Sequence, residues 1–201
     1  MIDVLAAVRA RLDAHFSAAG ITAEPVSASI TFLGTERIDV LRYGPDLRSD
    51  FAEVYHYVTL GCSRHPMFDP TELVSDPIHG PRAEVVVSLR GATPTGLAKS
   101  LAVLAAAPAV EGLILDADAL VDLETPLFES APFTAFLLGD SDIDDVALPE
   151  PLSPVRVLSA TPITPTEAAW VRLKGADAMR EAWQADGVDV QDPTRRAASP
   201  S

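Results

Sequence analysis

The chain has 201 residues, of which 48% are hydrophobic and 22% are charged, a composition typical of a folded protein with one substantial core. Its 29 acidic residues outnumber 15 basic ones, and the net charge of -14 disfavours direct binding to the phosphate backbone of nucleic acids. The single cysteine, Cys62, excludes an intramolecular disulfide, and the lack of a leader peptide or long apolar run predicts a cytoplasmic protein without a membrane partner.

The first half of the chain predicts one helix followed by strands. Apolar residues recur at helical spacing over residues 4–19, where Asp3 is placed to cap the start of the helix and Gly20 to end it. The next segments are rich in β-branched and aromatic residues and predict three strands, at residues 28–33, 38–43 and 52–60. Prolines and glycines then predict a long irregular loop over residues 61–81, and such loops often carry function.

The second half predicts a strand at 83–89, a helix at 95–107 and further strands at 113–115, 119–123, 133–138 and 155–159. Thr164 and Glu167 form the pattern of a capping box, which predicts a helix ending near Gly175 and a last short helix after it. We therefore expect an α+β fold, in which helices pack against a mixed, largely antiparallel β-sheet. Residues 1–187 are expected to form a single domain, and residues 188–201, which offer few apolar side chains, a disordered tail.

Three patterns suggest catalytic or ligand chemistry, but each lacks the spacing that the chemistry needs. Residues 91–100 resemble a phosphate-binding loop in which two residues separate Gly96 from Lys99, and the acidic turn at residues 140–145 lacks the glycine of a calcium loop. Metal-ligating residue types occur in the long loop without ligand spacing; these are His65, Asp69, Glu72, Asp76 and His79. We therefore predict no cofactor, no metal and no enzymatic activity. The alternative is a hydrolase-like or metal-dependent enzyme that uses the 61–81 loop.

The segment from Tyr57 to Met67 resembles the strand and turn signature of suppressor-of-fused domains, in which an aromatic residue, Thr-Leu-Gly, Ser and Pro-Met follow in this order. The strand from Arg82 and the segments at residues 136–138 and 162–167 are similar to further motifs of that family. At residues 119–127 the chain contains no histidine, whereas many members carry a Gly-His pair there. The candidate partner-binding or family-signature residues are Tyr57, Thr59, Gly61, Ser63, Pro66, Met67, Arg82, Glu84, Pro162, Ile163 and Glu167.

The resemblance implies a suppressor-of-fused-like domain of a bacterial, single-domain protein that works by holding another protein. Eukaryotic members of the family restrain a transcription factor, and bacterial members are often associated with toxin neutralisation. We therefore expect a non-enzymatic protein-binding module, either an immunity-type protein that neutralises a toxin or a regulator that restrains its partner. The acidic composition makes a basic protein, such as a toxin domain or a regulator, the partner to look for.

Overall fold

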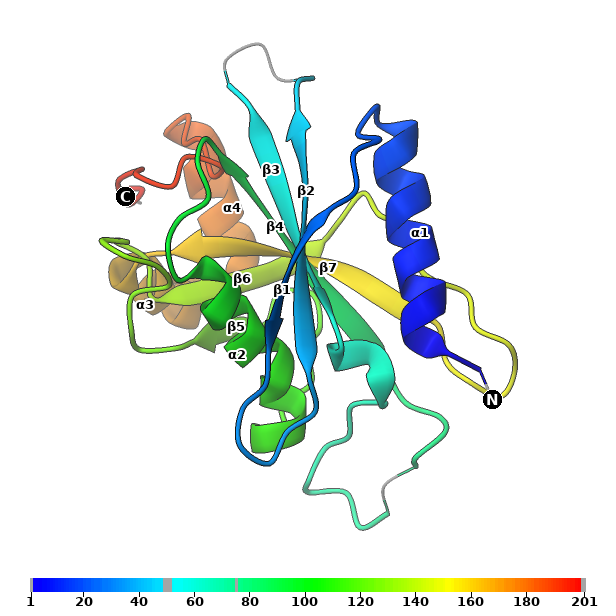
Figure 1. The fold of residues 1–201 in the computed structure, drawn as a ribbon. Helices are drawn as coiled ribbons and strands as arrows, with labels where there is room; N and C mark the ends of the chain where they lie inside the picture. Colours follow the sequence, from blue (N-terminus) through cyan, green and yellow to red (C-terminus); the bar gives the residue numbers. More distant parts are fainter. Residues whose placement is uncertain (1, 49–51, 75, 200–201) are drawn as a thin grey trace.

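The computed structural model describes residues 2–48, 52–74 and 76–199. The described residues form four α-helices, one short 3-10 helix and seven strands (Figure 1). In chain order these are α1 (Val4–Ala18), β1 (Val26–Ile30), β2 (Ile38–Asp46), β3 (Val54–Leu60), η1 (Cys62–Arg64), β4 (Arg82–Arg90), α2 (Leu97–Glu111), β5 (Leu120–Asp122), β6 (Ala135–Asp140), β7 (Val155–Ile163), α3 (Pro165–Lys174) and α4 (Ala176–Ala185). No helix in these ranges has both the length and the apolar character needed to cross a membrane.

The described strands form one sheet in the order β1-β2-β3-β4-β7-β6-β5. Neighbouring strands run antiparallel except β4 and β7, which run parallel. A parallel pair needs a crossover, and here α2, β5 and β6 supply it between β4 and β7. The predicted α+β fold with a mixed, largely antiparallel sheet is therefore confirmed.

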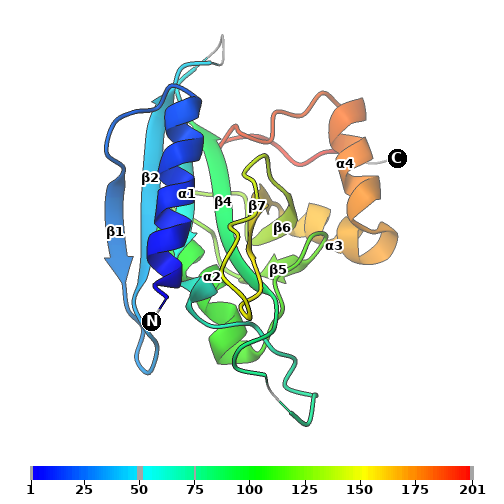
Figure 2. The same ribbon diagram turned by 90° about the vertical axis from the view of Figure 1, so that its right-hand side faces the viewer.

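The helices cover the two faces of the sheet unequally. On one face α2 buries Leu97, Leu101 and Leu104 completely, in the largest apolar cluster of the described residues. On the other face α1 packs at one side through Val8 and Leu12, whereas α3 and α4 pack over β6 and the end of β7. Figure 2 shows β4 and β7 lying between α1 and the C-terminal elements. On this face, the part of β4 and β7 between α1 and the C-terminal helices is not covered by a helix.

Local signals account for where several helices begin and end. The Asp3 carboxylate accepts a hydrogen bond from Ala6 N–H at 3.0 Å, as a residue that caps a helix does. Thr164 and Glu167 form both hydrogen bonds of the capping box at the start of α3, and Gly175 follows its last turn. The prediction of a strand at residues 113–115 is wrong. Leu115 there is buried against the long loop, and its N–H faces Met67 Sδ at 3.3 Å instead of a neighbouring strand.

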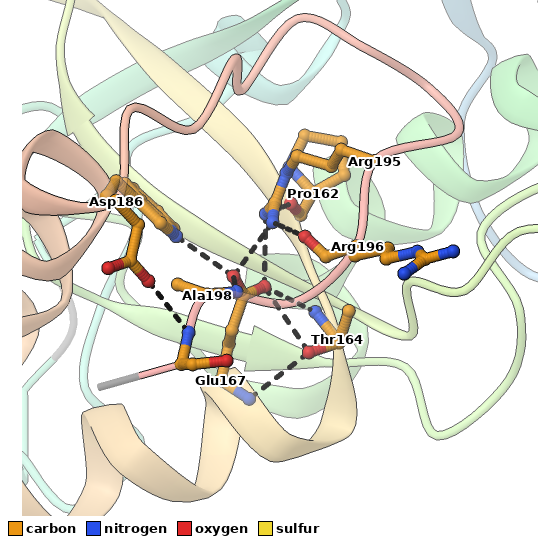
Figure 3. A network of polar contacts seen from close by, with 9 residues as sticks. Pro162, Thr164, Glu167, Asp186, Arg195, Arg196 and Ala198 are labelled. Atoms are coloured by element: carbon orange, nitrogen blue, oxygen red, sulfur yellow. Dashed lines mark hydrogen bonds and ion pairs between the residues drawn. The ribbon is translucent and has the colours of Figure 1, made fainter. Parts of the chain in front are cut away.

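The expected disorder of the C-terminal tail differs from the structure. Residues 188–199 contain neither helix nor strand, yet Arg195 and Ala198 are only 6% and 4% exposed. Arg195 binds the Glu167 carboxylate of α3, and Ala198 N–H donates to the same carboxylate (Figure 3). The expectation counted apolar side chains only. It missed a charged side chain that is buried because a buried carboxylate of opposite charge faces it.

Candidate functional site

The signature residues after β3 form a buried cluster around the Glu84 carboxylate. The Thr59 hydroxyl donates to Glu84 Oε2 at 2.6 Å. Glu84 Oε1 accepts from Gly61 N–H at 2.8 Å, from Ser63 N–H at 3.0 Å and from the Ser63 hydroxyl at 2.6 Å. Burial raises the pKa of Glu84, and these hydrogen bonds act in the opposite direction. The carboxylate therefore holds the turn at residues 61–64 in one conformation.

Neighbouring signature residues extend this support to the long loop. Arg82 is buried and donates to the backbone carbonyls of Ser63 and Arg64, both at 2.9 Å. Met67 is 4% exposed, and its N–H donates to the Pro81 carbonyl at 2.8 Å, which closes the base of the loop. Tyr57 is also buried, and its hydroxyl donates to Thr93 Oγ1 at 3.0 Å.

The C-terminal signature residues form a second buried cluster, shown in Figure 3. Burial disfavours the charged form of Glu167, but hydrogen bonds from Arg195, Thr164, Ala198 and Trp183 outweigh this, so the pKa of Glu167 is lowered. Pro162 contributes its carbonyl, which accepts from Arg195 Nη2 at 2.8 Å, and Ile163 is fully buried beneath α3 and α4. This cluster fixes the C-terminal segment to the domain.

Because most residues of the two clusters are buried, they shape surfaces more than they offer atoms to a partner. The long loop does not bring its metal-ligating residue types together either. His65 pairs with Glu36 at 2.6 Å, and His79 pairs with Asp76 at 2.8 Å. Burial raises the pKa of the Cys62 thiol, which opposes the thiolate form that a nucleophile needs.

A groove opens on the sheet face that the helices leave uncovered. It has a volume of about 570 Å³ and extends from the end of α1 across β3, β4 and β7 to Gln191 of the C-terminal segment. Its floor contains polar side chains at positions where the same faces of the strands are otherwise apolar. On β7, Val155 and Val157 pack under α1 and Ile163 packs under α3 and α4, whereas Ser159 and Thr161 between them line the groove.

Three side chains in the groove are hydrogen-bonded in series. His56 Nδ1 lies 2.7 Å from Ser88 Oγ, and His56 Nε2 lies 2.9 Å from Asp46 Oδ2. Hydrogen bonds from Arg48 and His56 lower the pKa of Asp46, so its carboxylate is charged at neutral pH. The series has the composition of a catalytic triad, but Ser88 lies inside β4, paired with His56 of β3, and not at a turn that would present N–H groups to an oxyanion. The series is better suited to binding polar groups than to acyl transfer.

The acidic turn at residues 140–145 forms one wall of this groove. Asp140 and Asp142 line it and are 83% and 80% exposed, and Asp144 beside them is 86% exposed. Arg156 of β7 donates to Asp140 at 2.9 Å, whereas the contacts of the other two with α1 are longer: Asp142 lies 3.8 Å from His15 and Asp144 lies 3.8 Å from Arg11. Exposed carboxylates beside a concave surface favour a basic ligand. Sequence patterns identified this turn but not its neighbours His15, His56 and Ser88. His15 lies in the last turn of α1, and the only signal for His56 and Ser88 was that they are polar residues in apolar strands.

Comparison with known proteins agrees with this fold. Residues 34–196 match the family model described as suppressor of fused protein (SUFU). No curated protein matches the chain. A SUFU homologue from Neisseria gonorrhoeae, whose crystal structure is known, is 18% identical to this chain, with a TM-score of 0.64. The match covers 98% of this chain and 97% of that one.

Two further solved structures share the fold. The structure of a Sufu-Fu complex is 15% identical with a TM-score of 0.67, and the match covers 97% of this chain and 91% of that one. Drosophila Suppressor of Fused is 14% identical to this chain, with a TM-score of 0.65. The match covers 97% of this chain but only 51% of the Drosophila chain, so this chain spans about half of that length. At such identities the likeness concerns the fold, and the family model carries the assignment.

Proposed function

The chain belongs to the suppressor of fused family, and we propose that it is a non-enzymatic module that binds a basic segment of another protein in the groove between α1 and the C-terminal segment. A family that includes a protein solved in a Sufu-Fu complex is consistent with a protein-binding role. The observation that carries the proposal is the position of the acidic turn, whose exposed carboxylates stand beside a concave surface lined by both polar and apolar side chains.

The groove supplies the kinds of contact that such a segment needs. Asp142, with Asp144 beside it, would attract lysine or arginine side chains, and His56, Ser88 and Ser159 offer donors and acceptors to backbone or side-chain groups. Both roles expected for this family, neutralising a toxin and restraining a regulator, require this kind of binding. The enzyme alternative lacks comparable support. Among the described positions of the loop at residues 61–81, each histidine is paired with a carboxylate, and burial keeps the Cys62 thiol from acting as an activated nucleophile.

The test is affinity capture from cells that produce the protein, with bound proteins quantified by mass spectrometry. We compare the wild-type chain with a groove variant, Asp142→Asn with Asp144→Asn, and with a control variant of the same charge, Glu124→Gln with Glu129→Gln. The control positions lie in a separate concavity beside α2. A specific partner should be retained by wild type and control and be reduced about tenfold or more by the groove variant, since close charge pairs contribute roughly 1.5 kcal/mol or more.

Two results would contradict the proposal. One is the absence of any protein that the wild-type chain enriches over an unrelated acidic protein. The other is equal loss of the partner from both variants, which would assign the effect to net charge and not to the groove.

A further inference from the structure

One edge of the sheet is open. β1 is the last strand of the sheet, and within the described residues it pairs with β2 alone. Figure 2 shows β1 as the outermost element on its side of the fold. The backbone N–H and C=O groups on its outer side therefore meet no strand in the described ranges, and a row of such groups pairs readily with the strand of another chain.

The opposite edge of the sheet differs from this one. There β5 is only three residues long, and its Asp122 accepts a hydrogen bond from Arg172 of α3 at 2.8 Å. A short strand and a charged side chain are ordinary ways in which a protein protects an edge. β1 has five residues without a charge or a proline, its register with β2 contains no bulge, and its first four residues are exposed. β1 is therefore the edge that is open to pairing.

The sequence of β1, Val-Ser-Ala-Ser-Ile, reads nearly the same in both directions. An antiparallel pair of β1 with a second copy of itself, centred on Ala28, places Val26 opposite Ile30 and Ser27 opposite Ser29. Two β-branched apolar side chains, or two hydroxyls, suit facing positions on neighbouring strands. A two-fold contact requires such self-complementarity, because the same surface serves both copies.

The side chains of β1 are available for these pairs. Val26 is 57% exposed, and Ile30 of the second copy would cover it. On the other face of the strand, the Ser29 hydroxyl already donates to the Asp39 carboxylate. Its oxygen is thus left to accept a hydrogen bond from Ser27 of the second copy.

The carboxylates beside the strand are paired within the chain. Glu24, just before β1, pairs with Arg9 at 2.5 Å, and Asp39, opposite Ser29, pairs with Arg37 at 3.2 Å. The contact itself therefore brings no unpaired like charges together. Repulsion between two copies comes instead from the net charge of -14 on each chain, which acts at longer range and is screened by salt.

We infer that β1 is a self-association edge, through which two copies of this chain pair antiparallel about a two-fold axis at Ala28 and join their sheets into one. The axis is perpendicular to the sheet, so the two α1 helices lie on the same face of the dimer. One five-residue strand is a small contact beside the roughly 1,000 Å² of a stable interface, so the dimer is weak and depends on protein concentration. The inference does not depend on what the acidic groove binds.

Cysteine cross-linking tests the register. Facing Cβ atoms of an antiparallel pair lie about 4.5 to 5.5 Å apart, close to the reach of a disulfide. With copper–phenanthroline as the oxidant, Ala28→Cys should cross-link two chains about tenfold or more faster than Leu173→Cys, at an exposed position on α3. Ser27→Cys and Ser29→Cys should each cross-link slowly alone and rapidly when mixed. Wild type, whose only cysteine is Cys62, measures the background.

Charge variants test the contact without oxidation, by sedimentation equilibrium. The dimer fraction of wild type should rise with protein concentration and with salt. Ala28→Lys should abolish it, because two lysines would face each other, and so should Ala28→Glu. An equimolar mixture of these two variants should restore the dimer, which a folding defect in either would prevent.

Three results would overturn the inference. One is a wild-type chain that stays monomeric at about 1 mM in roughly 0.5 M salt, where repulsion is screened. Another is a dimer that Ala28→Lys leaves intact, which would place the contact elsewhere. The third is equal cross-linking rates for Ala28→Cys and Leu173→Cys, which would indicate random collision.

Discussion

A buried carboxylate is stable only where hydrogen-bond donors replace its water, and Glu84 receives four such bonds from three residues. Replacing it by alanine would leave two hydroxyls and two backbone N–H groups without their acceptor. We expect Glu84→Ala to lower the free energy of unfolding by roughly 3 kcal/mol or more, and Glu84→Gln by less, because the amide oxygen keeps part of the cluster. Urea denaturation of the three proteins at pH 7 measures this order.

The same residue predicts a pH dependence with a definite sign. Burial raises the pKa of Glu84 above its ordinary value of 4.5, so the folded chain holds this proton more tightly than the unfolded chain. Its contribution to stability is therefore fully present below pH 4.5 and is lost as the pH rises through the raised pKa. The stability of wild type relative to Glu84→Gln should fall over this range. A difference that is constant with pH, or that grows, would contradict the assignment.

Among the elements, the C-terminal segment behaves as part of the domain. Arg195 is buried against Glu167, and its guanidinium lies 5.0 Å from the centre of the Phe133 ring and 5.6 Å from that of Trp183. Removing one partner of a buried ion pair leaves the other without compensation, a change that costs about 3 to 5 kcal/mol. The segment therefore contributes to stability through one charged residue more than through its apolar area.

Deleting residues 188–201 should accordingly destabilise the protein. At about 2 to 4 °C of melting temperature per kcal/mol for a domain of this size, a loss of about 3 kcal/mol corresponds to roughly 6 °C or more. Arg195→Met should reproduce most of the effect, whereas Arg196→Ala, at the exposed neighbouring arginine, should not. Differential scanning fluorimetry of the four proteins is sufficient. An unchanged melting temperature on deletion would show that the segment contributes nothing.

The elements that the sequence predicted well are those with local signals. The caps at Asp3 and Thr164 lie within three residues of the groups they bind, so a short window contains the whole interaction. The burial of Arg195 depends on Glu167, 28 residues earlier, and no pattern in the tail itself reveals it. No local pattern reveals the groove either, since it exists only because α1 and the C-terminal elements lie on one face of the sheet with a gap between them. Both features depend on tertiary packing.

At the scale of the whole molecule, a net charge of -14 creates a field that extends beyond any single contact. Such a field guides an oppositely charged partner toward the surface but adds little once the two are in contact, where shape and desolvated pairs decide the lifetime. The acidic turn lies beside the groove, so the field and the proposed groove contact act at the same place. Association and dissociation should therefore respond differently to salt.

For a basic partner, we expect the association rate to fall about tenfold as ionic strength rises from roughly 0.05 M to 0.5 M, because the Debye length shortens from more than 10 Å to less than 5 Å. The dissociation rate should change much less. Asp142→Asn with Asp144→Asn should make the salt dependence of association shallower, and Glu124→Gln with Glu129→Gln should leave it closer to that of wild type. Stopped-flow measurements at four or more salt concentrations give these slopes. Equal slopes for the two variants would assign steering to the total charge, and an association rate insensitive to salt would exclude a basic partner.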